Sequence, residues 1–447
     1  MSAPANPALA YSNSQTNIGI LKELYSDDVW VMKNLILNRN PALAIFDKDE
    51  TEGGMAGKYF TIPVIQDVGA GRSAGFGSAQ QYQTPPVTVE FQVTTVSNYS
   101  VASLTGQFLR ASAESIGAFM PAAEMNTKVA FQSCYNDLAH DLFSDGSGVR
   151  GTYGLGNGSI AAGVIQLDSI GSAMFFNIGQ ALNSFSISGL TPTISTGGAL
   201  GFVIGVDTSL GQITVSATQG GAAGVPSNWS SAFPYLGAVG DTNFVSNGLS
   251  SALMLKMAGL GAWIPSVTPG PADNFFGVNR SNSPSKLAGM RFPLSAESIQ
   301  DALIDSVNVL AANGNECGDP DLIFINPISY QTLVKQLTAQ GQYQMIKAQM
   351  NEEVSISFKA LVLPTANGEI SILQDRNVPG QTAYIVNSKT WKIRSLGKVP
   401  QFLTYMGLYD QIGFPVQGQD AVELHVGYYL NLCGNSPGSN AVVSLPQ

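Results

Sequence analysis

The chain has 447 residues, enough for two or three domains with separate cores, and its apolar fraction of 44% is ordinary for a globular protein. Only 12% of its residues are charged, about half the usual share. Since a soluble monomer normally keeps a charged surface, this composition predicts that other copies of the chain cover much of it. The net charge of −10 argues against a protein that grips nucleic acid, but not against one that encloses it.

The cysteines and the candidate targeting segments give little information about the class of protein. The cysteines are few and widely spaced: Cys134, Cys317 and Cys433. They fit neither a metal site nor a disulfide framework, which predicts buried thiols in a reducing compartment. No signal peptide is expected, because the first basic residue is Lys22. The most apolar stretch, residues 249–265, has Lys256 at its centre, so we expect a buried or partner-facing segment rather than a membrane span.

A long β-hairpin is the most informative feature near the N-terminus. Residues 1–16 are predicted to form an extended arm, and residues 17–37 an amphipathic helix. Residues 58–65 then have a β-rich composition, and residues 87–94 alternate strictly between apolar and polar side chains. The loop between them, 69–81, carries too little apolar surface to become ordered on its own subunit, because fixing each residue costs about 1–2 kcal/mol. We therefore expect a neighbouring subunit to receive this tip.

The predicted inter-subunit contact residues all lie in the tip: Gly69, Gly71, Arg72, Gly75, Phe76, Gly77 and Gln80. Arg72 is the only charged residue there. It either keeps the loop soluble or pairs with a carboxylate of a neighbour, and the sequence favours neither interpretation.

A long helix is predicted over residues 112–143, where apolar side chains recur at helical spacing. Its buried stripe includes Phe131, Tyr135, Leu138 and Leu142. Pro121 either kinks this helix or marks its start.

The composition changes after residue 150. Few charges occur between residues 151 and 270: Asp168, Asp207, Asp241 and Lys256. Short β-type runs lie at 164–167, 202–206 and 212–215, and the last two flank a predicted hairpin loop. We expect an inserted all-β module, such as a small barrel.

Alternating helices and strands follow residue 275. Ser295 is expected to cap a helix with Ile299, Leu303 and Val307 on its buried stripe. Residues 322–325 read as a buried strand, and Asn326-Pro327 as the start of a second helix. Further strands are predicted at 354–364 and 369–374, around an Asn367-Gly368 turn, and at 383–386, 391–393 and 422–426.

No motif for catalysis or ligand binding is recognisable. His140 and His425 lie at unrelated places and are expected on exposed faces. The acidic residues 47–52 fail the calcium-loop pattern, because Glu52 and Lys58 stand where glycine and glutamate are needed. We therefore expect no catalytic residue, no metal and no cofactor, and a protein that is not an enzyme.

The order of these parts resembles the major capsid proteins of tailed bacteriophages, which have the Hong Kong ninety-seven capsid fold. Residues 142–148 resemble the end of that family's spine helix, and 275–280 with 287–289 resemble the re-entry after an insertion. Residues 324–327, with Tyr330 and Leu333, resemble the strand-to-helix step of its axial domain. The likeness covers residues 17–148 and 272–435.

The resemblance implies an α+β fold with an N-terminal arm, an extended loop, a spine helix, peripheral and axial domains, and an inserted β module. The implied boundaries run in chain order: arm 1–54, extended loop 55–95, peripheral domain with spine helix 96–149, insertion 150–271, return to the peripheral domain 272–294, axial domain 295–395, and C-terminal strands of the peripheral domain 396–447.

It also implies a function. Copies of the chain would form hexamers and pentamers of an icosahedral virion shell, assembled in the host cytoplasm without a membrane. The shell would enclose double-stranded DNA without binding it specifically. A separate scaffold, a portal and a decoration protein are the expected partners. No covalent cross-link through a loop lysine is expected, because Lys58 at the base is the loop's only lysine.

Two other classes of structural protein stay open at this point. One is a β-rich surface adhesin or tail-fibre component, against which the absent signal peptide and the α/β unit at 295–338 argue. The other is the shell of a cellular nanocompartment with the same fold.

Overall fold

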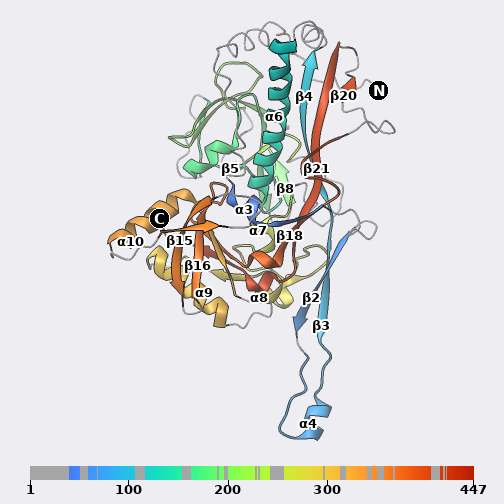
Figure 1. Ribbon diagram of the computed structural model, residues 1–447, viewed down its shortest axis with the longest axis vertical. Helices are drawn as coiled ribbons and strands as arrows, with labels where there is room; N and C mark the ends of the chain where they lie inside the picture. Colours follow the sequence, from blue (N-terminus) through green and yellow to red (C-terminus); the bar gives the residue numbers. More distant parts are fainter. Residues whose placement is uncertain are drawn as a thin grey trace.

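The structure is a computed structural model that describes residues 40–50, 59–67, 69–105, 116–153, 163–188, 191–195, 200–226, 229, 232–241, 256–294, 297–312, 319–339, 345–349, 357–365, 368–403, 413–415, 418 and 420–446. The predicted arm, the helix at 17–37, Ser295 and Cys317 lie outside these residues. The described part contains three hydrophobic cores and a hairpin that projects from them (Figure 1).

The hairpin consists of β2 (Phe60–Asp67) and β3 (Val87–Val93), which pair antiparallel from Phe60↔Val93 outward. In β3 the apolar Val89, Phe91 and Val93 are buried or half-buried while the polar residues between them are exposed, which confirms the period of two predicted for this strand. A short helix, α4 (Phe76–Gln81), stands at the far end of the ribbon, well away from the rest of the molecule (Figure 1).

The spine helix α6 (Ile116–Asp141) lies along β4 (Val96–Thr105) and β21 (Ala421–Gly434), as Figure 1 shows. β4 and β21 pair over the full length of β4, which binds the middle of the chain to its C-terminal part. Pro121 lies inside the helix rather than at its start. The same sheet is completed by four short strands: β1 (Asp47–Asp49), β18 (Trp391–Ser395), β19 (Gln401–Phe402) and β20 (Gly413–Pro415).

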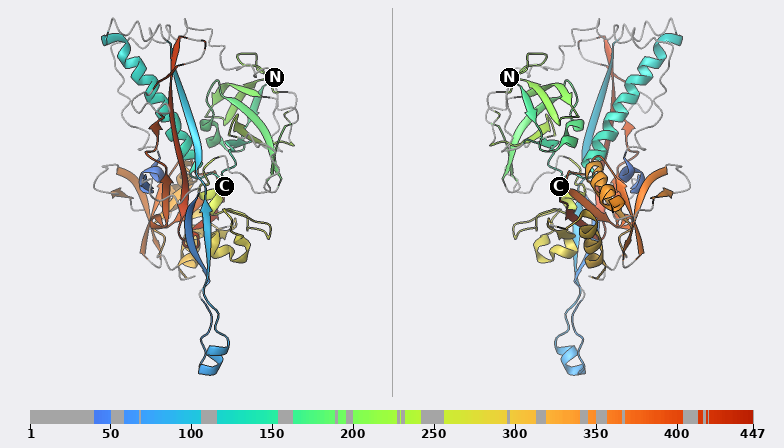
Figure 2. Two further views of the ribbon diagram at one scale, coloured as in Figure 1. Left: turned by 90° about the vertical axis from the view of Figure 1, so that its right-hand side faces the viewer. Right: turned by 90° about the vertical axis from the view of Figure 1, so that its left-hand side faces the viewer.

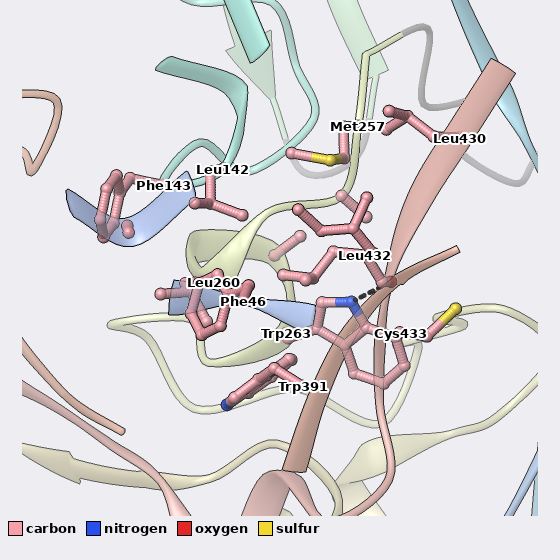
Figure 3. Packing of buried hydrophobic residues seen from close by; sticks show 14 of the residues in the cluster. Phe46, Leu142, Phe143, Met257, Leu260, Trp263, Trp391, Leu430, Leu432 and Cys433 are labelled. Atoms are coloured by element: carbon pink, nitrogen blue, oxygen red, sulfur yellow. Dashed lines mark hydrogen bonds between the residues drawn. The ribbon is translucent and has the colours of Figure 1, made fainter. Parts of the chain in front are cut away.

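The first core lies where this sheet meets α3 (Pro41–Ile45) and α7 (Leu260–Trp263). Trp263 is fully buried at its centre, and its indole Nε1 donates a hydrogen bond to the Leu432 carbonyl at 3.0 Å (Figure 3). Trp391 packs edge-on against Trp263 at 5.9 Å between ring centroids. Pairing the indole N–H lets this large side chain be buried without leaving a donor unsatisfied.

A second core lies between a seven-stranded sheet and two helices, α9 (Ile299–Ala312) and α10 (Pro327–Ala339). The strands, in spatial order, are β12 (Met290–Phe292), β22 (Ala441–Ser444), β17 (Thr382–Val386), β13 (Leu322–Ile325), β16 (Gly368–Gln374), β15 (Ser357–Thr365) and β14 (Met345–Gln349). The predicted helices and the buried strand β13 are confirmed. So is the antiparallel β15–β16 pair.

Two strands differ from the expected grouping. β22 pairs with β12 and β17 in the second sheet, although residues 396–447 were expected to join the peripheral sheet. Conversely, β18 pairs with β1 and β21 in the spine sheet, although it falls within the expected axial segment. Period-two patterning shows that a segment is a strand, but it does not show which sheet receives it.

The inserted module is a closed barrel. Its strands run β5 (Gly151–Thr152), β11 (Tyr235–Ala238), β7 (Ala181–Ser188), β9 (Gly201–Asp207), β10 (Gln212–Ser216) and β6 (Val164–Gln166), with β8 (Thr191–Ile194) beside β7. The ring closes where Tyr153 bridges Leu167 and the Asp168 amide donates to the Thr152 carbonyl at 2.8 Å. Its interior is filled by its own core, so it is a packed module rather than a ligand-binding barrel.

The end of the module is earlier than expected. Residues 257–264, including Met257, Leu260 and Trp263, belong to the first core and not to the barrel core. The expected boundary at residue 271 is therefore wrong, because the apolar stretch that follows Lys256 is central to the main body. That stretch is buried, as expected of it, rather than exposed to a membrane.

Candidate assembly interface

The base of the hairpin is fixed to the first core. Phe91 of β3 is fully buried and packs edge-on against Trp263 at 5.2 Å between ring centroids. The Gln92 amide donates to the Phe276 carbonyl at 3.0 Å. Next to it, the Arg280 guanidinium lies 4.0 Å from the Phe275 ring centroid and pairs with Asp273 at 2.9 Å. These contacts hold the base of the hairpin in a fixed position on the body.

Burial falls steadily along the ribbon toward its tip. On the apolar face of β3, Phe91 and Val93 are buried, Val89 is half-buried, and Val87 is 47% exposed. On the other face of the ribbon, Ile65 of β2, which pairs with Thr88, is 51% exposed. The sequence continues the apolar alternation beyond the point where this subunit can cover it. Such a pattern is typical of a strand whose outer part is covered by another molecule.

Local hydrogen bonds join the two arms of the tip. The Ala70 amide donates to Thr84 Oγ1 and the Thr84 amide to the Ala70 carbonyl, each at 2.8 Å, which ties the two arms together. Beyond them, α4 exposes Phe76 (83%), with Tyr82 (69%) at its end. Two exposed aromatic side chains at the end of a long projection favour a partner that buries them.

The predicted tip residues have different structural roles. Gly69 and Gly71 line the close approach of the two arms, since a Cβ atom on Gly69 would lie 2.0 Å from the Thr84 carbonyl oxygen. Gly75 precedes α4, whereas Gly77 and Gln80 lie within it, fully accessible. Arg72 is exposed and makes no ion pair with any residue that the structure describes. Tyr82 was missed from sequence, although an aromatic residue in a polar loop is a usable signal.

The four predicted spine-helix residues point toward the molecule itself. Leu138 and Leu142 are fully buried in the first core. Phe131 is half-buried against Phe402, with 4.9 Å between ring centroids. The Tyr135 hydroxyl donates to the Val399 carbonyl at 3.4 Å. These residues hold the helix on the sheet that carries the hairpin.

The described residues give little support for a catalytic site. His140 was expected on an exposed face, but its side chain is only 13% exposed and its ring packs against Phe175 of the barrel at 4.4 Å. His425 pairs with Glu423 at 3.2 Å. Burial raises the pKa of both the Cys134 and the Cys433 thiol to about 12, so neither is a reactive thiolate.

In the described part of the chain, no cluster of three or more histidine, cysteine, aspartate or glutamate side chains could hold a metal ion. Among the described helices, none combines the length and the apolar character that crossing a membrane requires.

The structure reveals a charged cluster that the sequence did not predict. Asp137 and Asp141 of α6 meet Arg150, Asp241 and Lys256 at the junction with the barrel. Asp241 and Lys256 are two of the few charges in the module's sequence, and their position near its end was the only available signal.

Comparisons with known proteins agree with this architecture. Residues 240–408 match the family described as SU10 major capsid protein. The capsid asymmetric unit of cyanophage A-1(L) superimposes with a TM-score of 0.51 at 9% identity, covering 95% of this chain and 97% of that one. No curated protein matches.

Two further solved structures are less similar. The capsid of a native GTA particle has a TM-score of 0.42 at 8% identity, covering 99% of this chain and all of that one. The SrpI encapsulin complex of Synechococcus elongatus has a TM-score of 0.43 at 8% identity, covering 96% of this chain and 94% of that one.

The family match lies across the end of the barrel and the second sheet, and the cyanophage likeness extends over nearly the whole chain. The predicted capsid fold is thereby confirmed. The chain thus has the fold of a tailed-bacteriophage capsid protein, and its residues 240–408 are similar to the SU10 major capsid protein family.

Proposed function

We propose that the chain is a major capsid protein, that its copies form an icosahedral shell around double-stranded DNA, and that each subunit is bound to a neighbour through its hairpin tip. The observation that carries the proposal is the tip itself. It is rooted in the first core by Phe91, leaves its own subunit, and ends in the exposed side chains of Phe76 and Tyr82.

The energetics favour many modest contacts over one strong contact. Burying one large apolar side chain contributes roughly 1.5–3 kcal/mol. In a closed shell each copy offers one tip and receives another, so the contacts of all copies are linked and the assembly is far more stable than a single pair. An ion pair between Arg72 and a carboxylate of the receiving copy would make the orientation of the tip contact more specific.

We assign the two body sheets to the two domains that the resemblance implied. The seven-stranded sheet, made of β12–β17 and β22, corresponds with α9 and α10 to the axial domain near the capsomer centre. The spine sheet with α6 corresponds to the peripheral domain, where the hairpin begins. A separate scaffold, a portal and a decoration protein are the proposed partners, and assembly is proposed in the host cytoplasm.

The acidity of the chain supports enclosure of DNA without binding. With a net charge of −10, the chain as a whole attracts phosphates little, which would let packaged DNA slide past the wall and leave. Nuclease treatment of purified particles tests this proposal. Protected double-stranded DNA supports it, whereas particles that carry only protein cargo indicate a nanocompartment shell.

The tip contact is tested by changing its aromatic side chains. A Phe76→Ser/Tyr82→Ser variant should give folded, soluble subunits or capsomers but no closed shells in negative-stain electron microscopy. The matched control is Ile328→Ser on α10, since Ile328 is also exposed (52%) but lies far from the hairpin (Figure 1). Shells of normal yield from the double variant would refute the proposed contact.

A further inference from the structure

The barrel is joined to the body by two adjacent crossings of the chain. Arg150 enters the barrel just before β5, and β5 pairs with β11, the last described strand before the exit at Asp241. The Arg150 amide donates to the Leu236 carbonyl at 2.8 Å, so the two crossings lie side by side. If these two paired strands were the only connection, they would act as a hinge. The barrel could then bend relative to the body about an axis through the two strands, although twisting would be resisted.

A buried ionic network lies across this hinge. Arg150 reaches in two directions, with Nη1 3.1 Å from Asp137 Oδ1 on α6 and Nη2 3.0 Å from Asp241 Oδ2 at the exit. Lys256 Nζ lies 3.1 Å from Asp241 Oδ1 and 3.8 Å from Asp141 Oδ2 on α6. Each cation therefore connects the spine helix to the exit of the barrel.

These side chains are well shielded from water. The exposed fractions are 5% for Lys256 and Asp141, 10% for Arg150, and 19–22% for Asp241 and Asp137. Ion pairs in such surroundings are screened little by salt. Removing one partner leaves an uncompensated charge in the interior, which is strongly unfavourable.

Asp137 and Lys256 are held in their charged forms despite their burial. Burial by itself would raise the pKa of Asp137, but the positive charges of Arg150 and Lys256 outweigh it and hold that pKa below its ordinary value. Burial would lower the pKa of Lys256, but the three neighbouring carboxylates, Asp141 foremost, hold it above its ordinary value.

Uncharged contacts extend the same attachment away from the hinge line. The His140 ring of α6 packs against Phe175, and Arg150 Nη1 also donates to the Phe175 carbonyl at 3.3 Å. Ser169 of the barrel also lies close to Gly380, just before β17, since a Cβ atom added to Gly380 would be 3.1 Å from Ser169 Oγ. Figure 2 shows the barrel on the side of the β4–β21 sheet opposite the upper part of α6.

From this geometry we propose that Arg150 and Lys256 are positioning residues, which form an ionic lock that fixes the orientation of the barrel on the spine helix. A buried ionic network is a weak source of net stability, since apolar replacements of both partners are often as stable. Its geometric demands instead select one arrangement. The barrel is thus presented to neighbouring copies as part of a rigid subunit.

The orientation is measurable as a distance in the unassembled chain. Spin labels at Val129→Cys on α6 and Ile178→Cys in the barrel, with Cys317 replaced by serine, report the barrel-to-spine distance by pulsed electron resonance. Both labelled positions are exposed (46% and 72%), and the two described native cysteines are buried. The unsubstituted lock should give one narrow distance distribution.

Breaking the lock should release the barrel without unfolding it. Arg150→Met and Lys256→Met should each at least double the width of the distribution. Asp141→Asn/Lys256→Met leaves no uncompensated Asp141 charge but still lacks the Lys256 bridge, so its distribution should stay as broad as that of Lys256→Met. Lys286→Met, which breaks the exposed pair with Asp67, is the control and should change nothing.

Two results would overturn the proposal. One is a folded Arg150→Met chain with the narrow distribution of the parent. The other is a narrow distribution in the double variant, which would show that an uncompensated charge, and not the lost bridge, releases the barrel. If Arg150→Met does not fold, Arg150→Lys serves in its place, since it keeps the charge but cannot span both carboxylates. Because the chain is unassembled, the result is independent of shell formation.

Discussion

Single glycines decide whether the two arms of the hairpin can meet. We predict that Gly69→Ala disrupts the tip, because the added Cβ would lie 2.0 Å from the Thr84 carbonyl oxygen and 3.1 Å from the backbone of Pro85. The arms must separate, and the Ala70–Thr84 hydrogen bonds are then lost. Shell yield should fall sharply in a sizing-column assay.

Gly77→Ala is the matched control for that experiment. A Cβ atom at Gly77 meets nothing within 4 Å, and the position lies inside α4. Alanine favours a helix over glycine by roughly 0.5–1 kcal/mol, so shell yield should be unchanged or higher. Equal losses in the two variants would mean that the approach of the arms is unimportant.

Asp375 should give the chain a pH-dependent stability. It is 1% exposed and accepts hydrogen bonds from Asn377 at 2.8–2.9 Å, and burial raises its pKa to about 6. Because a raised pKa in the folded state favours the protonated acid, its stabilising effect is complete below about pH 3.8 and lost as the pH rises toward 6.

The size of this effect is on the order of 3 kcal/mol in the free energy of unfolding. Urea unfolding of the unassembled chain at pH 4, 5 and 6 measures it. Asp375→Asn should remove this contribution to the pH dependence of the free energy of unfolding, whatever the absolute stability of the variant. An unchanged slope in the variant would assign the pH dependence to other groups.

At the scale of elements, the spine helix depends on its inner face. Leu138→Ala should destabilise the unassembled chain by about 2–5 kcal/mol, since Leu138 is fully buried between the helix and the sheet. Val129→Ala on the same helix is the comparison, because Val129 is 46% exposed and should change stability by no more than about 0.5 kcal/mol. Similar losses from both, measured by chemical denaturation, would show that Leu138 has no special packing role.

Elements whose signals are local could be predicted from sequence. The alternation of β3, the buried stripe of α9 and the Asn326-Pro327 start of α10 each follow from a few adjacent residues. The cap of α9 was misplaced by three residues. Ser298 Oγ, not Ser295, accepts from the Asp301 amide at 3.2 Å, and boundaries of this kind depend on fine geometry.

Long-range partners could not be predicted in the same way. The position of β22 beside β12, the burial of α7 in the first core and the contact of His140 with the barrel all join residues that are distant in sequence. Periodicity shows that one face of an element is buried, but it does not identify the element that covers it. The ionic lock was missed for this reason.

At the scale of the molecule, separate cores predict separable parts. Replacing residues 151–255 by a short linker should leave a folded body, because the barrel core shares no residue with the other two. Extending the deletion to residue 271 should abolish folding, since it removes Trp263 and its hydrogen bond to Leu432. Near-ultraviolet circular dichroism distinguishes the two, and a folded product of the longer deletion would contradict the assignment of α7 to the main core.

Assembly is the central claim, and imaging tests it most directly. The chain is expressed alone and examined by negative-stain electron microscopy beside a sizing column. The fold, with its hairpin extended beyond its own subunit, predicts closed polyhedral shells or rings of five and six subunits. A well-behaved elongated trimer, as expected of a fibre protein, would contradict the account.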